Sequence, residues 1–232
     1  MSSSTIAGQS ESVRADSLVT KRATLGVFAR RGSARVFGAV AAVAVVGRIV
    51  VGDSGRGDLV VILATAIAIG PVEWVIHRFL LHADEQAWTS RRLGTGDGHR
   101  RHHIYPPELD WLLLAGSDAT IFISAFGVLT ALWTLPLAAV LDASGVGMFL
   151  TGWAGAAIAL LHYEWVHLLV HTRYRCRTPY YRRLARNHRL HHFRNERYWL
   201  GVTTNSGDRL LRTYPLAKGD VPLSETARTL GG

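Results

Sequence analysis

Residues 147–170 read GMFLTGWAGAAIALLHYEWVHLLV, an apolar run that ends among polar side chains. The run is longer than the ~20 residues that a helix needs to cross a bilayer. Glu164, His167 and His171 follow one another at spacings of three and four residues, so a helix places all three on one face. The stretch therefore predicts a membrane-spanning helix that carries polar groups, including two imidazoles, at its C-terminal end.

Three further apolar runs, 36–51, 59–76 and 111–141, extend this pattern to a four-helix membrane bundle of the all-α class. Arg48 interrupts the first run and is expected to reach a membrane interface. A turn near Pro136 is expected to end the third span. The bundle should occupy residues 33–215, between a disordered basic tail over 1–32 and a C-terminal tail over 216–232. The predicted spans are about 34–52, 58–80, 111–133 and 146–170.

Basic residues are unevenly distributed around these runs and predict the orientation. Arginine and lysine precede the first span, lie between the second and third, and follow the fourth, whereas the short loops 52–57 and 142–146 hold one arginine between them. The positive-inside rule then places both termini and all histidine-bearing loops in the cytoplasm. Anionic lipids there account for the net charge of +9, so no nucleic-acid partner is implied. Cys176, the single cysteine, agrees with a reducing compartment.

All eleven histidines lie in four short windows, 77–82, 99–103, 162–171 and 188–192. The windows contain HRFLLH, HRRHH, HLLVH and HRLHH, in which imidazoles recur at helical spacing. His77 and His82 are five residues apart, so the helix must turn or break between them if both bind one ion. An octahedral ion offers about six positions, and the number of imidazoles therefore points to two metals. These windows lie at helix ends, where a lipid tail can reach them from the bilayer.

Two carboxylates accompany the histidines inside apolar runs. Glu73 precedes His77 by four residues, and Glu164 precedes His167 by three. Carboxylates within membrane spans are costly and usually functional. Both are predicted to support catalysis by accepting an imidazole N–H and fixing the tautomer that binds metal. Tyr163 is a further candidate for this role.

The segments EWVIHRFLLH, GHRRHH, YEWVHLLVH and HRLHHF, followed by YWLGVTTNSGDRLLRTYP, resemble the histidine-box membrane oxygenases of the fatty acid hydroxylase and sterol desaturase superfamily. The resemblance covers about residues 70–215 and is greatest to fatty acid 2-hydroxylases. It implies a non-haem di-iron monooxygenase that uses O2 to hydroxylate an unactivated C–H bond of a fatty acyl chain, with zinc able to replace iron in purified protein. The implied metal ligands are His77, His82, His99, His102, His103, His167, His171, His188, His191 and His192.

Two departures from the family pattern leave alternatives open. The chain contains no cytochrome b5 segment, so electrons are expected from a separate donor resembling ferredoxin, flavodoxin or cytochrome b5. His162 forms an H-x4-H with His167, which resembles the third box of carotenoid hydroxylases and keeps a carotenoid or sterol-type hydroxylase or desaturase as an alternative. On a continuous helix His162 lies about 140° from His167. His162 is therefore not counted among the ligands. It is expected to form a hydrogen bond within the bundle, to line the substrate passage or to be a packed neutral histidine.

A membrane metal transporter is the alternative from another class of protein. Its ligands should lie near the bilayer midplane on broken helices, whereas the windows here cluster at helix ends. A zinc hydrolase is disfavoured because the chain has no H-E-x-x-H motif.

Overall fold

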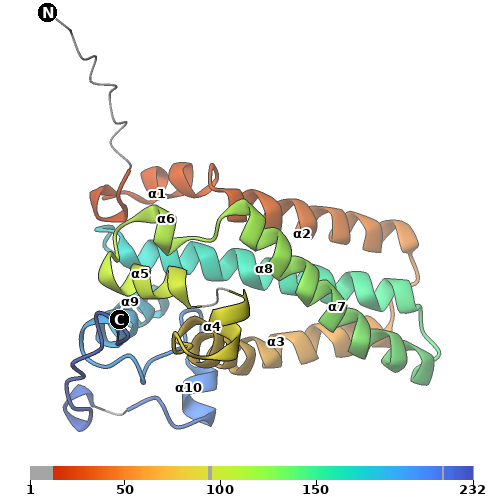
Figure 1. Ribbon diagram of the computed structural model, residues 1–232. Coiled ribbons are helices and arrows are strands. Elements are labelled where there is room, and N and C mark those ends of the chain that lie inside the picture. The colour runs from red at the N-terminus through yellow and green to blue at the C-terminus, as the bar shows by residue number, and fades with distance from the viewer. Residues whose placement is uncertain (1–12, 94–95, 216, 232) are drawn as a thin grey trace, which may run out of the picture.

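Four long apolar helices form the body of the molecule, and each arises from one of the apolar runs. The computed structural model describes residues 13–93, 96–215 and 217–231, and these include no named β-strand. Helix α8 packs against the other three long helices (Figure 1). All four are long and apolar enough to cross a membrane, which confirms the prediction of an all-α, multi-pass protein. They are α2 (Gly32–Val51), α3 (Arg56–Ile76), α7 (Gly116–Val140) and α8 (Gly145–His171).

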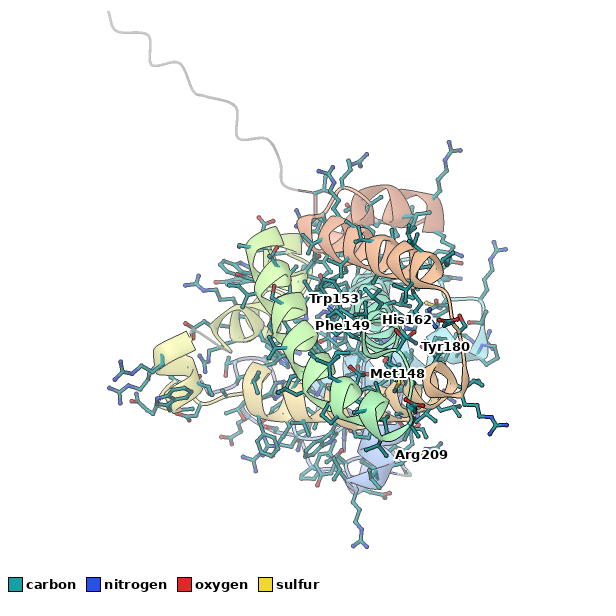
Figure 2. All side chains as sticks on the ribbon, turned by 90° about the vertical axis from the view of Figure 1, so that its right-hand side faces the viewer. Met148, Phe149, Trp153, His162, Tyr180 and Arg209 are labelled. Atoms are coloured by element: carbon teal, nitrogen blue, oxygen red, sulfur yellow. The ribbon has the colours of Figure 1, made fainter. Side chains whose placement is uncertain are left out.

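The outer surface of the bundle is apolar, as contact with lipid requires. Val50, Ile67 and Leu132 are 79%, 74% and 68% exposed. A large apolar surface of this kind is unusual in water but is the normal partner of acyl chains. Inside the bundle, small residues let the helices approach, and Met148 and Trp153 of α8 lie among the helices when the molecule is viewed along the bundle (Figure 2).

The third span differs from its prediction at both ends. A short helix, α6 (Leu109–Leu112), precedes α7, which then runs through Pro136 to Val140. The expected turn at Pro136 is therefore wrong. A proline this close to a helix end removes a single N–H donor, while the apolar surroundings favour keeping every other backbone bond within the helix. The turn falls at Asp142, whose φ is 49°.

Arg48 lies in the last turn of α2, where an ion pair holds it. Its side chain is only 11% exposed and pairs with Asp58 at 2.7 Å. Arg48 also donates to the carbonyl of Gly52, and Thr151 donates to Asp58. Burial of an arginine is tolerable when a carboxylate and further hydrogen bonds satisfy it. This cluster joins α2, α3 and α8 at the end of the bundle opposite the histidines.

The histidine-bearing end is covered by short helices and by both terminal segments (Figure 1). The short helices are α4 (Trp88–Leu93), α5 (Asp97–Ile104), α9 (Pro179–Phe193) and α10 (Ser206–Leu210). Gly70 of α3 and Gly207 of α10 allow the two helices to pack closely. A Cβ on Gly207 would lie 2.3 Å from the carbonyl oxygen of Gly70. Only glycine permits this approach of the two backbones.

The terminal segments are more ordered than the sequence suggested. Residues 1–12 of the expected disordered tail lie outside the described part, but η1 (Ala15–Ser17) and α1 (Lys21–Phe28) fold within the rest of it. Their Ala15, Leu18 and Phe28 are buried in one apolar cluster with Leu168 of α8. The expectation of disorder is therefore corrected from residue 13 onward, because a few apolar residues in a polar segment find a partner surface at the end of α8.

Candidate metal centre

A π-helical turn brings the first two histidines together. The last turn of the α3 span is η2 (His77–Leu81), in which the N–H of His82 donates to the carbonyl of His77 at 3.0 Å. This bond joins residues five apart and widens the helix, so the two rings lie 4.8 Å from each other. Such π-turns occur frequently at functional sites. The turn that a five-residue spacing requires is therefore present.

Three other helices supply the remaining imidazoles. α5 carries His99, His102 and His103 and ends at Ile104, just before two prolines. α8 ends on His171, one turn after His167. α9 begins at Pro179 behind Thr178, whose hydroxyl caps the helix by accepting from the N–H of Tyr181. Its inner face presents His188, His191 and His192 to the other helices, all of them buried.

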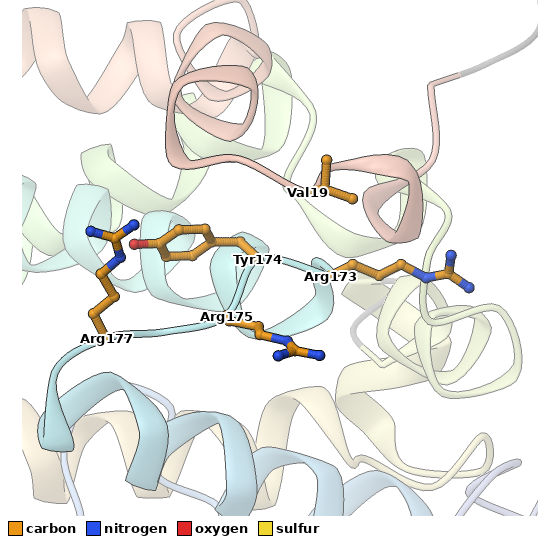
Figure 3. A pocket seen from close by; sticks show the side chains of 5 residues that line it. All are labelled: Val19, Arg173, Tyr174, Arg175 and Arg177. Atoms are coloured by element: carbon orange, nitrogen blue, oxygen red, sulfur yellow. The ribbon is translucent and has the colours of Figure 1, made fainter.

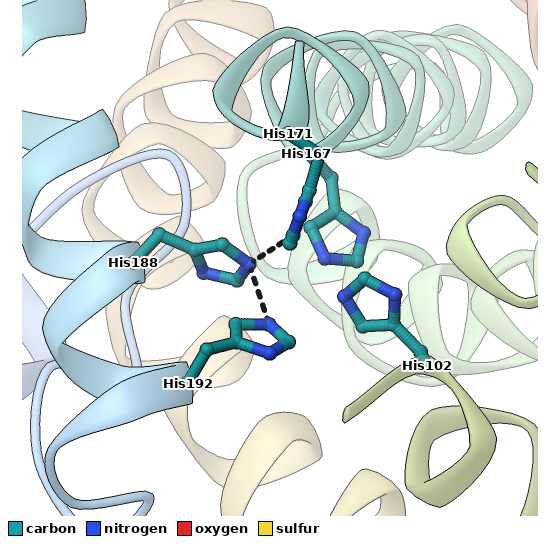
Figure 4. Close-up of side chains that lie close together, drawn as sticks. All are labelled: His102, His167, His171, His188 and His192. Atoms are coloured by element: carbon teal, nitrogen blue, oxygen red, sulfur yellow. Dashed lines mark hydrogen bonds between the residues drawn. The ribbon is translucent and has the colours of Figure 1, made fainter. Parts of the chain in front are cut away.

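The imidazoles gather into two groups, each with ligand atoms within 4.8 Å of one another. The five-histidine group is drawn from α5, α8 and α9 (Figure 4). The four-histidine group is drawn from α3 and its π-turn, α5 and α9. Nine of the ten predicted ligands fall into these groups. The members are His102, His167, His171, His188 and His192 in the first, and His77, His82, His99 and His191 in the second.

His103, the tenth predicted ligand, belongs to neither group but touches both. Its ring stacks on His192 with centroids 4.0 Å apart, and it lies 4.9 Å from His99 and 5.1 Å from His191. Its Nε2 is buried and has no hydrogen-bond partner. A buried polar atom without a partner is costly, and its position between the groups makes it available to either.

The spacing of ring nitrogens suits metal ions. Nε2 of His188 lies 2.8 Å from Nε2 of His171 and 3.0 Å from that of His192, and Nε2 of His99 lies 3.1 Å from that of His77 and 3.2 Å from that of His82. Metal–nitrogen bonds of about 2.0–2.1 Å meeting at right angles place neighbouring nitrogens about 3 Å apart. The donor set therefore fits two metal ions, one for each group.

Burial favours the protonation state that binds metal. The pKa values of His99, His102 and His188 lie well below 6.5, first because burial disfavours the charged ring and next because other histidines surround each one. Burial likewise lowers the pKa of His103 to about 4. The imidazoles are consequently neutral at pH 7 and keep a lone pair for a metal ion.

Backbone carbonyls, rather than carboxylates, orient several of these rings. Nδ1–H of His77 donates to the carbonyl of Leu200 at 2.5 Å, and Nδ1–H of His191 donates to the carbonyl of Tyr198 at 3.0 Å. Because a carbonyl only accepts, each bond fixes the proton on Nδ1 and leaves Nε2 free for a metal. Both rings belong to the four-histidine group, so residues 198–203, here called the cradle loop, set their orientation.

Glu73 acts on this loop and not on an imidazole. Its carboxylate accepts from the N–H groups of Val202 and Thr203 at 2.5 and 2.8 Å and from the Thr203 hydroxyl at 2.6 Å. The prediction that Glu73 accepts an imidazole N–H is therefore wrong. The N–H groups of the cradle loop reach this carboxylate, while the carbonyl of Leu200 in the same loop takes the imidazole N–H of His77.

Asp208 completes the support and was missed by sequence reasoning. Its buried carboxylate accepts from the N–H groups of Leu200 and Gly201 at 2.9 and 2.8 Å and from the Thr213 hydroxyl at 2.6 Å. Burial raises its pKa, although these three hydrogen bonds act in the opposite direction. Trp199, which directly precedes Leu200, has a φ of 54°, a conformation that costs energy for a residue with a side chain. Two carboxylates thus hold a strained loop in the shape that orients the rings.

Glu164 also has a different partner from the predicted one. It is buried and accepts from the N–H of Leu114, just before α7, at 3.1 Å. None of the hydrogen bonds found among the described residues joins it to an imidazole. Tyr163 lies against His167 with ring centroids 5.5 Å apart, and its buried hydroxyl has no partner. Glu164 therefore fixes the start of α7 relative to α8, and Tyr163 places a free hydroxyl close to the five-histidine group.

His162 stands apart from both groups. α8 is continuous from Gly145 to His171, so the ring of His162 leaves the helix in a different direction from His167. It lies nearly parallel to the ring of Tyr180, at 6.4 Å between centroids, and is half-buried (Figure 2). The ligand groups found among the described residues do not include it.

The C-terminal segment packs onto the site. The carbonyl of Ala227 accepts from Nδ1–H of His103 at 2.8 Å, and Thr226 donates to the carboxylate of Glu196 at 2.8 Å. Val221 and Ala227 are each only 2% exposed. Residues 217–231 are thus a structural part of the centre, since they orient the one histidine that lies between the two groups.

The fold and the site define a multi-pass membrane protein with a buried cluster of histidines that could hold metal ions. The sequence profile of fatty acid hydroxylases matches residues 62–213, which is more than half of the chain. The chain therefore belongs to the fatty acid hydroxylase family. No curated protein sequence matches it.

A similar solved structure is described as full-length Scs7p with only its hydroxylase domain visible. The two chains share 22% identity and superpose with a TM-score of 0.65, over 87% of this chain and 72% of the other. At this level of identity the likeness supports the arrangement of the helices.

Proposed function

We propose that the protein is an O2-dependent lipid hydroxylase that inserts one oxygen atom into an unactivated C–H bond of a fatty acyl chain. The observation that carries this proposal is the pairing of two imidazole groups at one end of four membrane-spanning helices. A site at that position meets acyl chains from the bilayer and electrons from the aqueous side. Family membership favours the same activity.

A pair of iron ions, when bound, supplies the activation of O2. The residues proposed to hold the two ions are those of the two groups together with His103. The chain contributes by keeping its imidazoles neutral, by fixing their tautomers through the carbonyls of Leu200, Tyr198 and Ala227, and by burying the centre away from water. A dry site prevents oxygen from being reduced without a substrate.

The proposed reaction needs electrons from outside the chain. One acyl C–H, one O2, two electrons and two protons give one alcohol and one water, so the acyl carbon and a donor are both oxidised. A separate protein of ferredoxin, flavodoxin or cytochrome b5 type is the proposed donor.

An apolar groove beside the bundle offers a surface for part of a lipid tail. It has a volume of about 180 Å³ and lies between α3 and α8, lined by Ile62, Ala66, Ile69 and Gly155 among others. We place the metal centre and both termini on the cytoplasmic side, because the basic residues gather at the histidine-bearing end.

The alternatives make different predictions for one experiment, lipid extraction from a host with and without the gene. An acyl hydroxylase adds a lipid one oxygen atom heavier than its precursor, and labelled O2 supplies that atom. A desaturase produces a lipid two hydrogen atoms lighter, and a carotenoid or sterol hydroxylase moves the added oxygen to another lipid class. A metal transporter changes cellular metal content and leaves the lipids unaltered. An unaltered lipid profile, with the protein folded and metal-loaded, would refute the proposal.

A further inference from the structure

A cationic surface lies directly behind three of the metal ligands. Residues 165–195 contain no aspartate or glutamate. Within this stretch seven arginines are exposed, in the segment that follows α8 and on α9. We call this surface the arginine face. Its members are Arg173, Arg175, Arg177, Arg182, Arg183, Arg186 and Arg189.

The arginine face lacks acidic partners of its own. Ion pairs among the described residues engage other arginines, such as Arg31 with Asp110 and Arg100 with Glu85, but none of these seven. Unpaired positive charges on one surface produce a strong local potential that attracts a negatively charged partner. Stability of the fold does not account for them, since like charges so close together repel.

Helix α9 connects this surface to the metal centre. Arg182, Arg186 and Arg189 follow one another at spacings of four and three residues, so they form one stripe along the helix. At 100° per residue, His188 leaves α9 about 160° from Arg186, and His192 follows Arg189 by three residues. Both rings are buried in the five-histidine group. A helix with its side chains is about 10–12 Å across. A molecule seated on the stripe is therefore only about one helix diameter from the ligands.

The surroundings favour an aqueous protein partner over a membrane surface. An amphipathic helix lying in the lipid interface shows large apolar side chains beside its basic ones. Near the arginine face, by contrast, exposed large apolar side chains are isolated: Phe193 at the end of α9 is 46% exposed, and Val19, which lines the same hollow as Arg173, is 61% exposed. Among the described residues they form no continuous apolar face beside the arginines. The guanidinium groups of Arg173, Arg175 and Arg177 are also spread around Tyr174 rather than gathered at one point (Figure 3). Spread charges match an extended acidic surface better than they match one phosphate group.

From these observations we infer that the arginine face is the docking surface for the electron donor, a small redox protein with an acidic face. The inference rests on the proposed function, which requires two electrons from outside the chain. Weak, electrostatically guided encounters of small contact area are typical of electron-transfer partners. The donor's cofactor would approach the centre across α9, through His188 and His192.

The test measures binding of a purified acidic iron–sulfur ferredoxin to the full-length, metal-loaded chain in detergent, by surface plasmon resonance at several salt concentrations. Arg186→Glu with Arg189→Glu changes the stripe, and Arg173→Glu with Arg175→Glu changes the preceding segment. Arg91→Glu with Arg92→Glu on α4 is the control, because these arginines are also exposed and the change in charge is equal. The metal content of each variant shows whether it has folded. If Arg186→Glu with Arg189→Glu loses metal, the binding of Arg173→Glu with Arg175→Glu is the result that tests the inference.

We expect the association rate constant at low salt to fall at least about tenfold in both arginine-face variants and to change little in the control. Added salt should likewise lower the association rate constant of the wild type. Unchanged binding in the variants, or an equal loss in the control, would overturn the inference. Arginine-face variants that still bind the ferredoxin but no longer bind phosphatidylserine vesicles would also overturn it, because that result would assign the surface to lipid. Failure of the proposed function shows separately, as an unaltered lipid profile in a host that expresses the wild type.

Discussion

Replacing Glu73 with glutamine tests how the cradle loop supports the centre. The carboxylate holds Val202 and Thr203 through three hydrogen bonds. In Glu73→Gln the amide oxygen still accepts from backbone N–H groups, but the amide nitrogen faces the Thr203 hydroxyl, and the acceptor loses any charge it carries. We expect the loop to loosen and the carbonyls of Tyr198 and Leu200 to hold their two imidazoles less firmly.

The size of the effect follows from the bonds that change. One bond is lost or reversed and two become weaker, which costs about 1–3 kcal/mol, since a hydrogen bond to a charged group contributes about 1.5–3 kcal/mol and a neutral one about 0.5–1.5. At 1.4 kcal/mol for each factor of ten, the metal affinity of the four-histidine group should fall about 10- to 100-fold. The five-histidine group, which none of the hydrogen bonds found among the described residues joins to the cradle loop, should keep its affinity.

The assay is a competitive titration of metal-free protein with ferrous ion and a chelator of known affinity. The ion held by the four-histidine group is identified as the one that His82→Ala loses. Glu164→Gln is the matched control, because it removes the same group from a buried position in a span while contacting Leu114 instead of the cradle loop. Equal losses at this ion in both variants, or no loss in Glu73→Gln, would mean that the Glu73 carboxylate does not support the four-histidine group through the cradle loop.

Four further outcomes can be measured on the same protein. His162→Ala should retain both ions and His167→Ala should lose one, as metal analysis will show; equal loss would mean that His162 is a ligand. Gly207→Ala places a methyl group 2.3 Å from the carbonyl oxygen of Gly70 and should lower the free energy of unfolding by about 1–3 kcal/mol, whereas Gly219→Ala, which has open space, should not. A chain ending at residue 215 lacks the carbonyl that orients His103, so it should bind metal more weakly than the full chain in the same titration. Metal-free protein should lose thermal stability as the pH falls from about 6.5 towards 4, because burial lowers the pKa of His103 and its neighbours and unfolding then takes up protons; a flat profile over that interval would contradict this.

The sequence predicts the features that depend on local composition and spacing. Apolar runs place the four spans, and spacings of three, four and five residues predict which imidazoles share a face and where the helix must turn. The features that it misses depend on the backbone and on distant contacts. The carbonyls of Leu200 and Ala227 have no signature in the sequence, and Glu73 finds its donors 129 and 130 residues away.

The misplaced turn at Pro136 and the ordered N-terminal segment have a related cause. Local rules treat proline as a helix breaker and a polar segment as disordered. In the structure, the loss of one bond near the end of α7 and the burial of Phe28 against the end of α8 override those preferences. Packing that is specified elsewhere in the chain decides both cases.

Metal analysis of detergent-purified protein, loaded with iron and shown to be active, measures whether the two imidazole groups hold two metal ions. We expect two ions per chain in the wild type, with one ion lost from His82→Ala and the other from His102→Ala. A single ion or fewer in the fully loaded, active wild type would contradict this expectation.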